Sequence, residues 1–203
     1  MRGYTGQAED GRLREEAYET RWGVGVVRLA GDLPLELELP DPARRAEGVP
    51  RGRWSALLER YFAGEPVAFD FDVAAYTEAL GCTTFERAVF AALAAVPYGR
   101  PVSYRDLAHA AGRPNAYRAV GSVMARNTLP VLLPCHRVIK NDGSLGSYGD
   151  DPTWKQRLLR LEGWDAGGAT DRLRRAHVAG ERRRRHRVTG DGGRVTATTG
   201  EER

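Results

Sequence analysis

The first part of the chain shows the short-range alternation of apolar and polar residues that is typical of strands. From Leu33 to Leu39 a leucine occupies every second position, and Pro34, Glu36 and Glu38 stand between the leucines, as in a half-buried strand. The stretch from Gly23 to Leu29 predicts a second strand, and residues 67–71 predict a third. Residues 1–20 show no such pattern and are predicted to be a polar lead-in.

Helical patterns with well-marked ends follow. A short helix is predicted from Trp54 to Phe62, closed by Gly64. Thr83 and Glu86 have the spacing of a capping box, so a longer helix is expected to begin there and to end near residue 95. The apolar positions of this longer helix recur at helical spacing, which predicts one buried face: Val89, Phe90, Leu93 and Val96.

Two short helices joined by a tight turn come next. Ser103 is the predicted N-cap of a helix from Tyr104 to Ala111, which Gly112 ends. Asn115 is the predicted cap of the following helix, Ala116–Arg126. Such a pair is typical of the helix-turn-helix of DNA-binding proteins, although many other helical domains contain one.

Together these elements predict an α/β fold in two parts. Residues 21–80 are expected to form a small α/β scaffold domain with a short antiparallel sheet, since they contain no cluster of reactive side chains. Residues 81–164 are expected to form a mainly helical domain that contains the helix-turn-helix and is winged-helix-like. Residues 165–203 are rich in arginine and lack apolar periodicity, so they are predicted to be a disordered tail.

Charge is distributed unevenly along the 203 residues, although the net charge is only +4. Residues 1–80 contain 10 basic and 15 acidic side chains, whereas residues 81–164 contain 11 basic and 6 acidic ones. Residues 165–203 contain 10 basic and 6 acidic side chains. A basic second half favours a polyanionic partner such as nucleic acid.

The composition excludes several classes of protein. Two cysteines, Cys82 and Cys135, are too few for a disulfide framework or a four-thiolate zinc site. No apolar run approaches the roughly 18 residues of a membrane span, and the first residues lack the apolar stretch of a signal peptide. We therefore expect a cytoplasmic protein without membrane contact, in which Cys82 is a structural thiol.

The most informative stretch is an apolar run, residues 129–139, that delivers Cys135 between Pro134 and His136. A buried cysteine usually acts as a small apolar residue, and it becomes a nucleophile only where a base or a positive field lowers its pKa. His136 and Arg137 supply both. Because the run is predicted to be extended, adjacent side chains should point to opposite faces, and a bridging water is the expected link between Cys135 and His136.

His136 would then need a third group to orient it, as in a catalytic triad. The candidate is Glu162, which follows a helix predicted from Thr153 to Leu161 with Asp151 as its cap and Pro152 in its first turn. The sequence by itself does not distinguish Glu162 from the other acidic residues.

The segment Pro134-Cys135-His136-Arg137-Val138 resembles the reactive motif of the O6-alkylguanine-DNA alkyltransferases, also called methylated-DNA–protein-cysteine methyltransferases. The resemblance covers about residues 83–163, and residues 22–72 look like the less regular N-terminal domain of that family. Further segments match at the expected offsets: Val102-Ser103-Tyr104, Arg118-Ala119-Val120-Gly121, Arg126-Asn127, and Leu158-Leu159 through Glu162-Gly163.

The resemblance implies DNA repair by direct transfer. The alkyl group of O6-alkylguanine, and less readily of O4-alkylthymine, would move irreversibly to Cys135, and the protein would be consumed. No metal, nucleotide or methyl-donor cofactor is expected. The expected partner is double-stranded DNA that contains O6-alkylguanine, and the protein is expected to act as a monomer.

The resemblance also assigns roles at the reactive centre. Cys135 is implied as the nucleophile in its thiolate form, His136 as a base that acts through a water, and Glu162 as the group that stabilises charged His136. Asn127 is implied to hold the turn before the reactive strand. Tyr104 is implied to donate a hydrogen bond to the departing guanine.

The target base must leave the stack to be reached, and Arg118 resembles the arginine that fills the vacated space. The helix that carries Arg118 is implied to enter the minor groove, which suits its small residues Ala119 and Gly121 and a recognition independent of sequence. The other implied DNA contacts are Ser103, Tyr104 and Asn141. The implied guanine pocket consists of Met124, Val138, Tyr148 and Gly149.

One segment of the implied pocket departs from the family pattern. The loop Gly149-Asp150-Asp151-Pro152 is usually richer in glycine, and here it carries two acidic residues. We hypothesise that methyl transfer is retained and that these acids alter the entry of bulky alkyl groups.

Three alternatives stay open. A damage sensor of the alkyltransferase-like kind binds alkylguanine without transferring the alkyl group, but it lacks the cysteine that this chain has as Cys135. A helix-turn-helix regulator would need side chains that read bases, and Ala119 and Gly121 offer few. A Cys–His hydrolase would need an oxyanion hole, for which no motif is evident.

Overall fold

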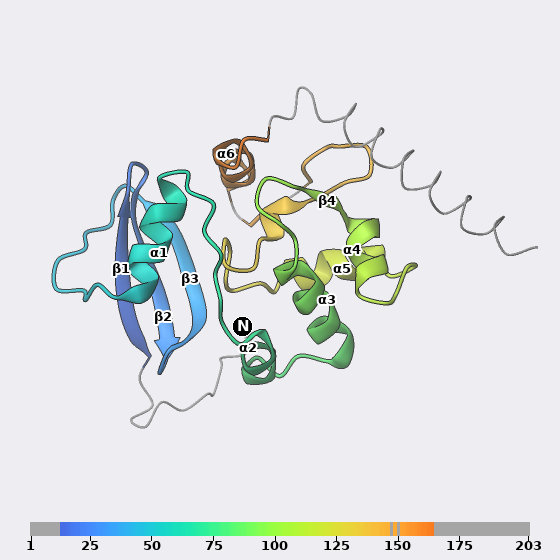
Figure 1. The fold of residues 1–203 in the computed structure, drawn as a ribbon, viewed down its shortest axis with the longest axis horizontal. Coiled ribbons are helices and arrows are strands. Elements are labelled where there is room, and N and C mark those ends of the chain that lie inside the picture. The colour runs from blue at the N-terminus through green and yellow to red at the C-terminus, as the bar shows by residue number, and fades with distance from the viewer. Residues whose placement is uncertain (1–12, 147, 150, 165–203) are drawn as a thin grey trace, which may run out of the picture. The chain divides into compact units, whose positions relative to one another are not determined.

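The computed structural model describes residues 13–146, 148–149 and 151–164, and its first three strands form an antiparallel sheet in the order β1-β2-β3 (Figure 1). Thr20 pairs with Gly23 and Ala30 pairs with Leu33, so a two-residue turn joins each pair of strands. The strands predicted at residues 23–29 and 33–39 are confirmed. The three strands are β1 (Arg14–Thr20), β2 (Gly23–Ala30) and β3 (Leu33–Asp41).

Strand β1 lies inside the predicted lead-in, so the lead-in prediction is wrong for residues 14–20. Glu16, Ala17 and Tyr18 are all buried, and a run of three buried residues that includes an acid shows no period of two. The acid has a structural reason, because Oε2 of Glu16 accepts hydrogen bonds from the backbone N–H groups of Trp54 and Ser55, both at 3.0 Å.

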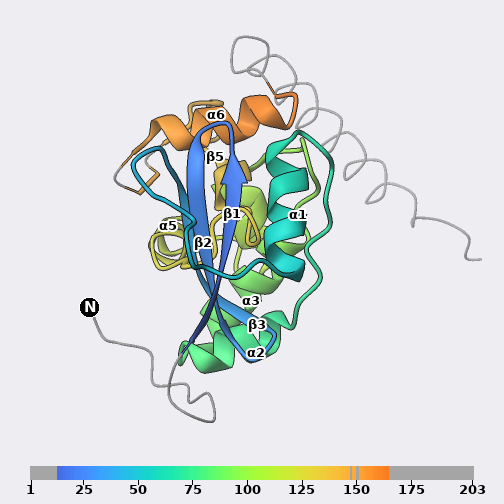
Figure 2. The ribbon, with the colours of Figure 1, turned by 90° about the vertical axis from the view of Figure 1, so that its left-hand side faces the viewer.

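Those two N–H groups belong to the first turn of α1 (Arg53–Phe62), which packs against β1 (Figure 2). A carboxylate at a helix N-terminus satisfies free N–H groups and interacts favourably with the helix dipole. A Cβ at Gly52 would lie 2.3 Å from the Glu16 carboxylate, so the close approach requires glycine. Helix α1 confirms the helix predicted at residues 54–62.

The strand predicted at residues 67–71 is wrong, because this segment has no regular structure. It leads instead into α2 (Val73–Ala79), which the pattern did not predict. Asp72 caps α2 by accepting a hydrogen bond from the N–H of Ala75 at 2.9 Å. With only seven residues, α2 is too short for apolar periodicity to be visible in the sequence.

The next three helices follow the predicted pattern, with one difference. Thr83 and Ser103 cap α3 (Thr84–Ala94) and α4 (Tyr104–Ala110) in capping boxes with Glu86 and Asp106. Helix α5 (Tyr117–Met124) begins after Ala116 and has no side-chain cap, so the prediction that Asn115 caps it is wrong. Asn115 lies two positions before the first helical residue, one position too early for an N-cap.

Residues 129–135, which were expected to be extended, do not form a strand. Cys135–Arg137 form a 3₁₀ turn, η1, and only Val138–Ile139 form a strand, β5. Strand β5 pairs in parallel with β4 (Val102–Ser103). Pro130 and Pro134 break the run, since proline has no N–H to donate to a ladder. The last helix, α6 (Thr153–Leu161), has the predicted bounds, but its N-cap position is Pro152, so the prediction that Asp151 is the cap is wrong. The Asp151 carboxylate still accepts a hydrogen bond from the N–H of Thr153 at 2.8 Å.

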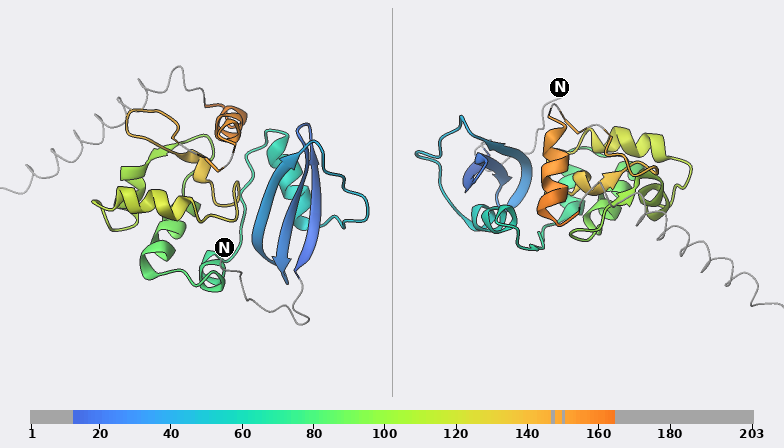
Figure 3. Two further views of the ribbon diagram at one scale, coloured as in Figure 1. Left: turned by 180° about the vertical axis from the view of Figure 1, so that it is seen from behind. Right: turned by 90° about the horizontal axis from the view of Figure 1, so that it is seen from above.

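The observed fold is therefore mixed α/β with a small antiparallel sheet, as predicted. Seen from above, α6 lies between the sheet and helices α4 and α5 (Figure 3). The buried side chains of the sheet, of α1 and of the helices form one continuous apolar core, which includes Tyr18, Tyr61, Phe90 and Leu158. None of the described helices is long and apolar enough to cross a membrane. The predicted tail, residues 165–203, lies outside the described residues.

Candidate active site

Cys135 is held at the start of η1 by a turn that Asn127 stabilises. The Asn127 side chain accepts from the N–H of Leu129 at 3.0 Å and donates to the carbonyl of Leu133 at 2.9 Å. The N–H of Cys135 donates to the same Leu133 carbonyl at 2.7 Å. Asn127 thus fixes both ends of the turn that presents the thiol.

The same turn contains a strained residue. Val131 has a φ of +77°, and it is the only residue other than glycine with a positive φ in the described part of the chain. A β-branched residue in this region is unfavourable, and such strain is usually found where the surrounding structure fixes a functional segment. Val131 is 1% exposed, so the surrounding core holds it in place.

His136 and Glu162 form the buried pair that the sequence analysis hypothesised. Nε2 of His136 lies 2.8 Å from Oε1 of Glu162, and both side chains are fully buried. Cys135 and His136 lie in a 3₁₀ turn. Their side chains therefore do not alternate between opposite faces, as they would in the expected extended segment. Nδ1 of His136 is buried and has no hydrogen-bond partner among the described residues.

Glu162 also binds three other groups. The Arg137 guanidinium donates to both carboxylate oxygens at 2.9–3.1 Å, and the N–H of Gly99 donates to Oε2 at 2.9 Å. The hydroxyl of Tyr61 donates to Oε1 at 2.7 Å. Despite burial, the hydrogen bonds from His136 and Arg137 lower the pKa of Glu162 to about 2, so this carboxylate is ionised at neutral pH.

The imidazole itself is neutral at neutral pH. Burial lowers the pKa of His136, because the surrounding core penalises the charged form, and Glu162 offsets only part of this effect. Arg137 neutralises much of the charge that Glu162 would otherwise present to the ring. A neutral His136 donates from Nε2 to Glu162 and keeps the lone pair of Nδ1 as a proton acceptor.

The Cys135 thiol is subject to opposing influences. Burial raises its pKa, whereas Asn127, Tyr148 and the ammonium group of Lys155 lower it. The Tyr148 hydroxyl is buried and close enough to the thiol for each group to shift the pKa of the other, but it forms no hydrogen bond of ordinary geometry. The thiol thus needs a base to ionise it, and it lies beside a positive charge that favours the thiolate.

Lys155 was not predicted from the sequence. This side chain is 1% exposed, and its Nζ donates to the carbonyl of Val138 at 2.6 Å. Burial lowers the pKa of Lys155 to about 8. Its ammonium group lies 5.8 Å from the ring of Tyr104 and 6.0 Å from the ring of Tyr148. A lysine in an amphipathic helix such as α6 usually lies on the solvated face, so the sequence pattern did not indicate that Lys155 is buried.

Tyr61 was missed for a related reason. It belongs to α1, in the half of the chain that was predicted to be scaffold, and it is fully buried. Besides its bond to Glu162, its hydroxyl lies 3.3 Å from Nε2 of His136. Only the three-dimensional contact, across 75 positions of sequence from His136, reveals this role.

The residues expected to bind DNA differ in exposure. Arg118 and Ala119 on α5 are exposed, and Gly121 is partly exposed, with open space beside the helix where a Cβ would stand. Asn141 is exposed. Ser103, in contrast, is 6% exposed, and its side chain is engaged in capping α4.

The residues expected to line a guanine pocket lie on several segments. Tyr104 and Met124 are partly buried, and Val138 is fully buried. Gly149 is exposed, with a φ of +46°. Asp150, on which the hypothesis about bulky adducts partly depends, lies outside the described residues.

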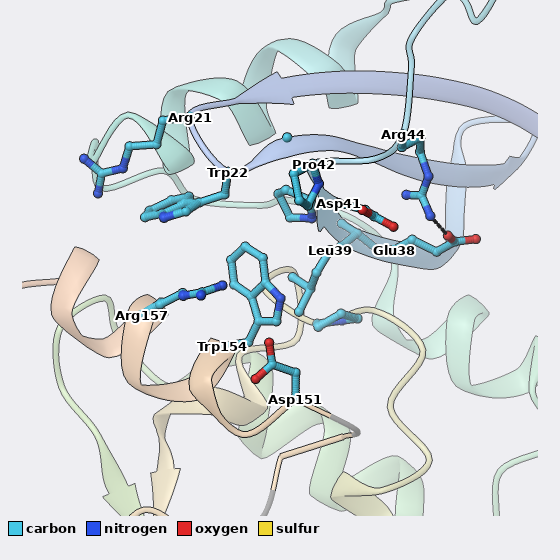
Figure 4. Close-up of a pocket in the computed structure, with 14 residues that line it drawn as sticks. Arg21, Trp22, Glu38, Leu39, Asp41, Pro42, Arg44, Asp151, Trp154 and Arg157 are labelled. Carbon is cyan, nitrogen blue, oxygen red and sulfur yellow. Dashed lines mark hydrogen bonds and ion pairs between the residues drawn. The ribbon is translucent and has the colours of Figure 1, made fainter.

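A cleft of about 960 Å³ lies elsewhere, between the β1–β2 turn, β3 and α6 (Figure 4). Trp22 and Trp154 meet edge to face in it, with ring centres 5.8 Å apart. None of the expected catalytic residues lines this cleft. Among the described residues, no three His, Cys, Asp or Glu side chains are grouped as a metal site would require.

Comparison with known proteins bears on the identity of the site. A family model described as the DNA-binding domain of 6-O-methylguanine DNA methyltransferase matches residues 84–164. This range includes the 3₁₀ turn, α4, α5 and α6, and therefore both Cys135 and Glu162.

Relatives extend the similarity to the N-terminal half. A methylated-DNA–protein-cysteine methyltransferase of Methanosarcina acetivorans is 39% identical over 151 residues, which is 69% of this chain and 93% of the relative. One from Mycobacterium tuberculosis is 38% identical over 148 residues, 68% of this chain and 87% of the relative. One from Methanosarcina barkeri is 41% identical over 105 residues, and this chain spans 63% of its length.

Solved structures of related proteins match the fold of this chain over most of its length. The crystal structure of the Mycobacterium tuberculosis O6-methylguanine methyltransferase matches with a TM-score of 0.57 and 29% identity, covering 74% of this chain and 92% of that one. A Mycobacterium tuberculosis protein crystallised in complex with DNA matches with a TM-score of 0.59 and 27% identity, covering 77% and 98%.

Proposed function

This chain belongs to the methylated-DNA–protein-cysteine methyltransferase family, and from that premise we propose how it repairs DNA. The alkyl group of O6-alkylguanine in duplex DNA moves directly and irreversibly to Cys135. The observation that carries the assignment to Cys135 is the arrangement beside it, where an ionised Glu162 holds a neutral His136 at 2.8 Å and leaves Nδ1 free.

In the proposed first step the thiol is ionised. The proton of Cys135 passes through a water to Nδ1 of His136, while Glu162 stabilises the imidazolium that forms. The positive charge of Lys155 favours the thiolate. The low pKa of Glu162 keeps this carboxylate charged throughout, so the proton rests on His136 and not on the acid.

In the second step the thiolate displaces the guanine. The S–C bond forms as the bond between the alkyl carbon and O6 breaks, and the electron pair of that bond returns to the guanine. Tyr104 donates a hydrogen bond that offsets the negative charge of the leaving base, and Lys155 lies 5.8 Å from its ring. No later step removes the alkyl group, so each molecule reacts once.

We assign the DNA-binding surface to residues 81–164 and a supporting role to residues 21–80. Helices α4 and α5 act as a helix-turn-helix in a winged-helix-like arrangement, and α5 faces the minor groove. Arg118 occupies the space that the flipped nucleotide leaves, and Ala119 and Gly121 let the backbone of α5 approach the groove. Asn141 contributes to the same surface, and the capping of α4 by Ser103 positions Tyr104.

The flipped base enters a pocket beside Cys135. Met124, Val138, Tyr148 and Gly149 line it in this proposal, and backbone groups near Val138 read the edge of the base. Binding by a monomer suffices, because one chain supplies both the surface and the thiol.

The test uses a duplex with one O6-methylguanine, and it measures restored guanine against the amount of protein. We expect one guanine restored per protein molecule and none with the variant Cys135→Ser, although this variant should still bind the damaged duplex. Turnover beyond one equivalent would contradict the proposal. Tight binding by the wild-type protein without any repair would instead support a damage sensor.

A further inference from the structure

Tyr117 stands apart from every other large apolar side chain in the described part of the chain. It is 41% exposed, whereas the other large apolar side chains there are buried or half-buried. It is also the first residue of α5, immediately before Arg118. Exposing an aromatic ring to water is unfavourable, and the position of this ring on the proposed DNA-binding surface gives it a candidate partner.

Two guanidinium groups flank the ring. Arg105 of α4 lies 6.0 Å from the ring centre and Arg118 lies 5.9 Å from it. Both arginines are exposed, and neither forms an ion pair with any of the described carboxylates. An aromatic face beside cations that are free to meet phosphates is the combination that binds unstacked nucleic acid.

The other residues at the start of α5 do not project beside the Tyr117 ring, because their side chains are small or buried. Gly121 lies one helical turn after Tyr117, with open space where a Cβ would stand. Val120 and Val123 point into the core, and Ala119 adds only a methyl group to the exposed face. Tyr117 and Arg118 are therefore the two large side chains that project from the start of this helix.

The Tyr117 ring is also linked to the reactive centre through the first two residues of α4. Tyr104 and Arg105 are consecutive residues at the start of α4. The Tyr104 ring lies near Lys155 at the reactive centre, whereas Arg105 reaches outward to Tyr117. Arg105 and its neighbour Tyr104 thus connect Tyr117 to the proposed pocket for the flipped base.

We propose that Tyr117 is a DNA-contacting residue whose ring stacks on a base left unstacked when the target nucleotide flips, and so stabilises the flipped state. The inference rests on the proposed function and adds a second projecting side chain to Arg118. Neighbouring residues on a helix point about 100° apart, so the two side chains occupy adjacent places in the DNA and do not compete. Minor-groove proteins commonly insert such apolar wedges between bases.

The test compares Tyr117→Ala with Tyr117→Phe, which keeps the ring and removes only the hydroxyl. Single-turnover methyl transfer is measured from a duplex with one O6-methylguanine, and benzyl transfer is measured from the free base O6-benzylguanine, which needs no flipping. We expect Tyr117→Ala to slow transfer from the duplex roughly 5- to 150-fold, as the loss of one stacked base would. Tyr117→Phe should remain within about twofold of wild type, and neither variant should affect the free base.

A third substrate sharpens the comparison. On a single-stranded oligonucleotide the target base is already accessible, so the deficit of Tyr117→Ala should largely disappear. Equal rates of wild type and Tyr117→Ala on the duplex would overturn the inference. Equal loss on duplex and free base would overturn it as well, since this would show that the ring only holds α4 against α5. No transfer by wild type from either substrate would contradict the proposed function itself.

Discussion

Glu162 is the residue on which the polar contacts of the candidate site converge. It accepts hydrogen bonds from His136, Arg137, Tyr61 and the backbone of Gly99, and its side chain is fully buried. The negative charge of this carboxylate and its hydrogen bonds together hold these donor groups in place. Removing the charge would leave the buried Arg137 guanidinium without its partner, which is costly in a low-dielectric interior.

We therefore predict that Glu162→Gln lowers the free energy of unfolding by about 3–5 kcal/mol, as the breaking of a buried ion pair usually does. The matched control is Glu65→Gln, which breaks the exposed pair between Glu65 and Arg60. It should cost less than about 1 kcal/mol. Urea denaturation of both variants measures the difference, and equal costs would show that the buried contacts contribute no more than surface ones.

The pH dependence of stability follows from the same carboxylate. The pKa of Glu162 lies at about 2 in the folded protein, below its ordinary value of 4.5. Its contribution is therefore complete above pH 4.5 and is lost as the pH falls toward 2. We predict that wild type loses more stability than Glu162→Gln between pH 5 and pH 3 in urea titrations. Parallel losses would contradict the assigned pKa.

At the level of single residues, the sequence predicted the pairing of His136 with Glu162 better than it predicted their surroundings. A motif marks Cys135 and His136, whereas only the family resemblance distinguished Glu162 from the other acidic residues. Tyr61 and Lys155 were missed because a buried tyrosine and a helical lysine look like ordinary core and surface residues. Their contacts with Glu162 and Val138 exist only once distant segments pack together.

The elements were predictable where local chemistry decides them. Capping boxes marked the starts of α3 and α4, and the period of two marked β3. The predictions failed where tertiary contacts decide the outcome. Strand β1 buries an acid to cap α1, and the turn at Val131 adopts a conformation that its own side chain disfavours.

The turn between α3 and β4 allows a test at the scale of elements. Gly99 has a φ of +67°, and a Cβ there would lie 2.8 Å from the carbonyl oxygen of Glu162. Gly112 has a φ of +72° and open space around it. Alanine at Gly112 should cost about 1 kcal/mol from backbone strain alone.

We predict that Gly99→Ala costs at least about 1 kcal/mol more than Gly112→Ala, because the added methyl group displaces the Glu162 backbone. It should also slow methyl transfer, whereas Gly112→Ala should leave the rate near wild type. Thermal unfolding and single-turnover transfer measure the two effects. Equal stability and equal rates in both variants would show that Gly99 serves only as a turn former.

At the scale of the whole molecule, the N-terminal half completes the site. Tyr61 of α1 reaches Glu162, and the backbone of Leu37 in β3 donates to the carbonyl of Thr128 at 2.8 Å, directly beside Asn127. The scaffold interpretation of this half therefore missed its hydrogen bonds to the reactive centre. One apolar core connects the two halves and includes Cys135, so a change at Cys135 affects the stability of the whole fold.

We predict that alkylation of Cys135 destabilises the protein. The thiol is only 8% exposed and lies in a tightly packed turn, and an added methyl group in such a place costs about 1–3 kcal/mol. The melting temperature should fall by several degrees after one equivalent of repair. An unchanged or raised melting temperature would show that the site holds free space for the alkyl group.

Cys135 is proposed to receive the alkyl group directly from the damaged base. Mass spectrometry of the intact protein and its peptides, after incubation with a duplex that contains one O6-methylguanine, tests this transfer. We predict one added methyl group, on Cys135 and not on Cys82, together with restored guanine. An unmodified Cys135, or a methyl group on another residue, would show that Cys135 is not the acceptor.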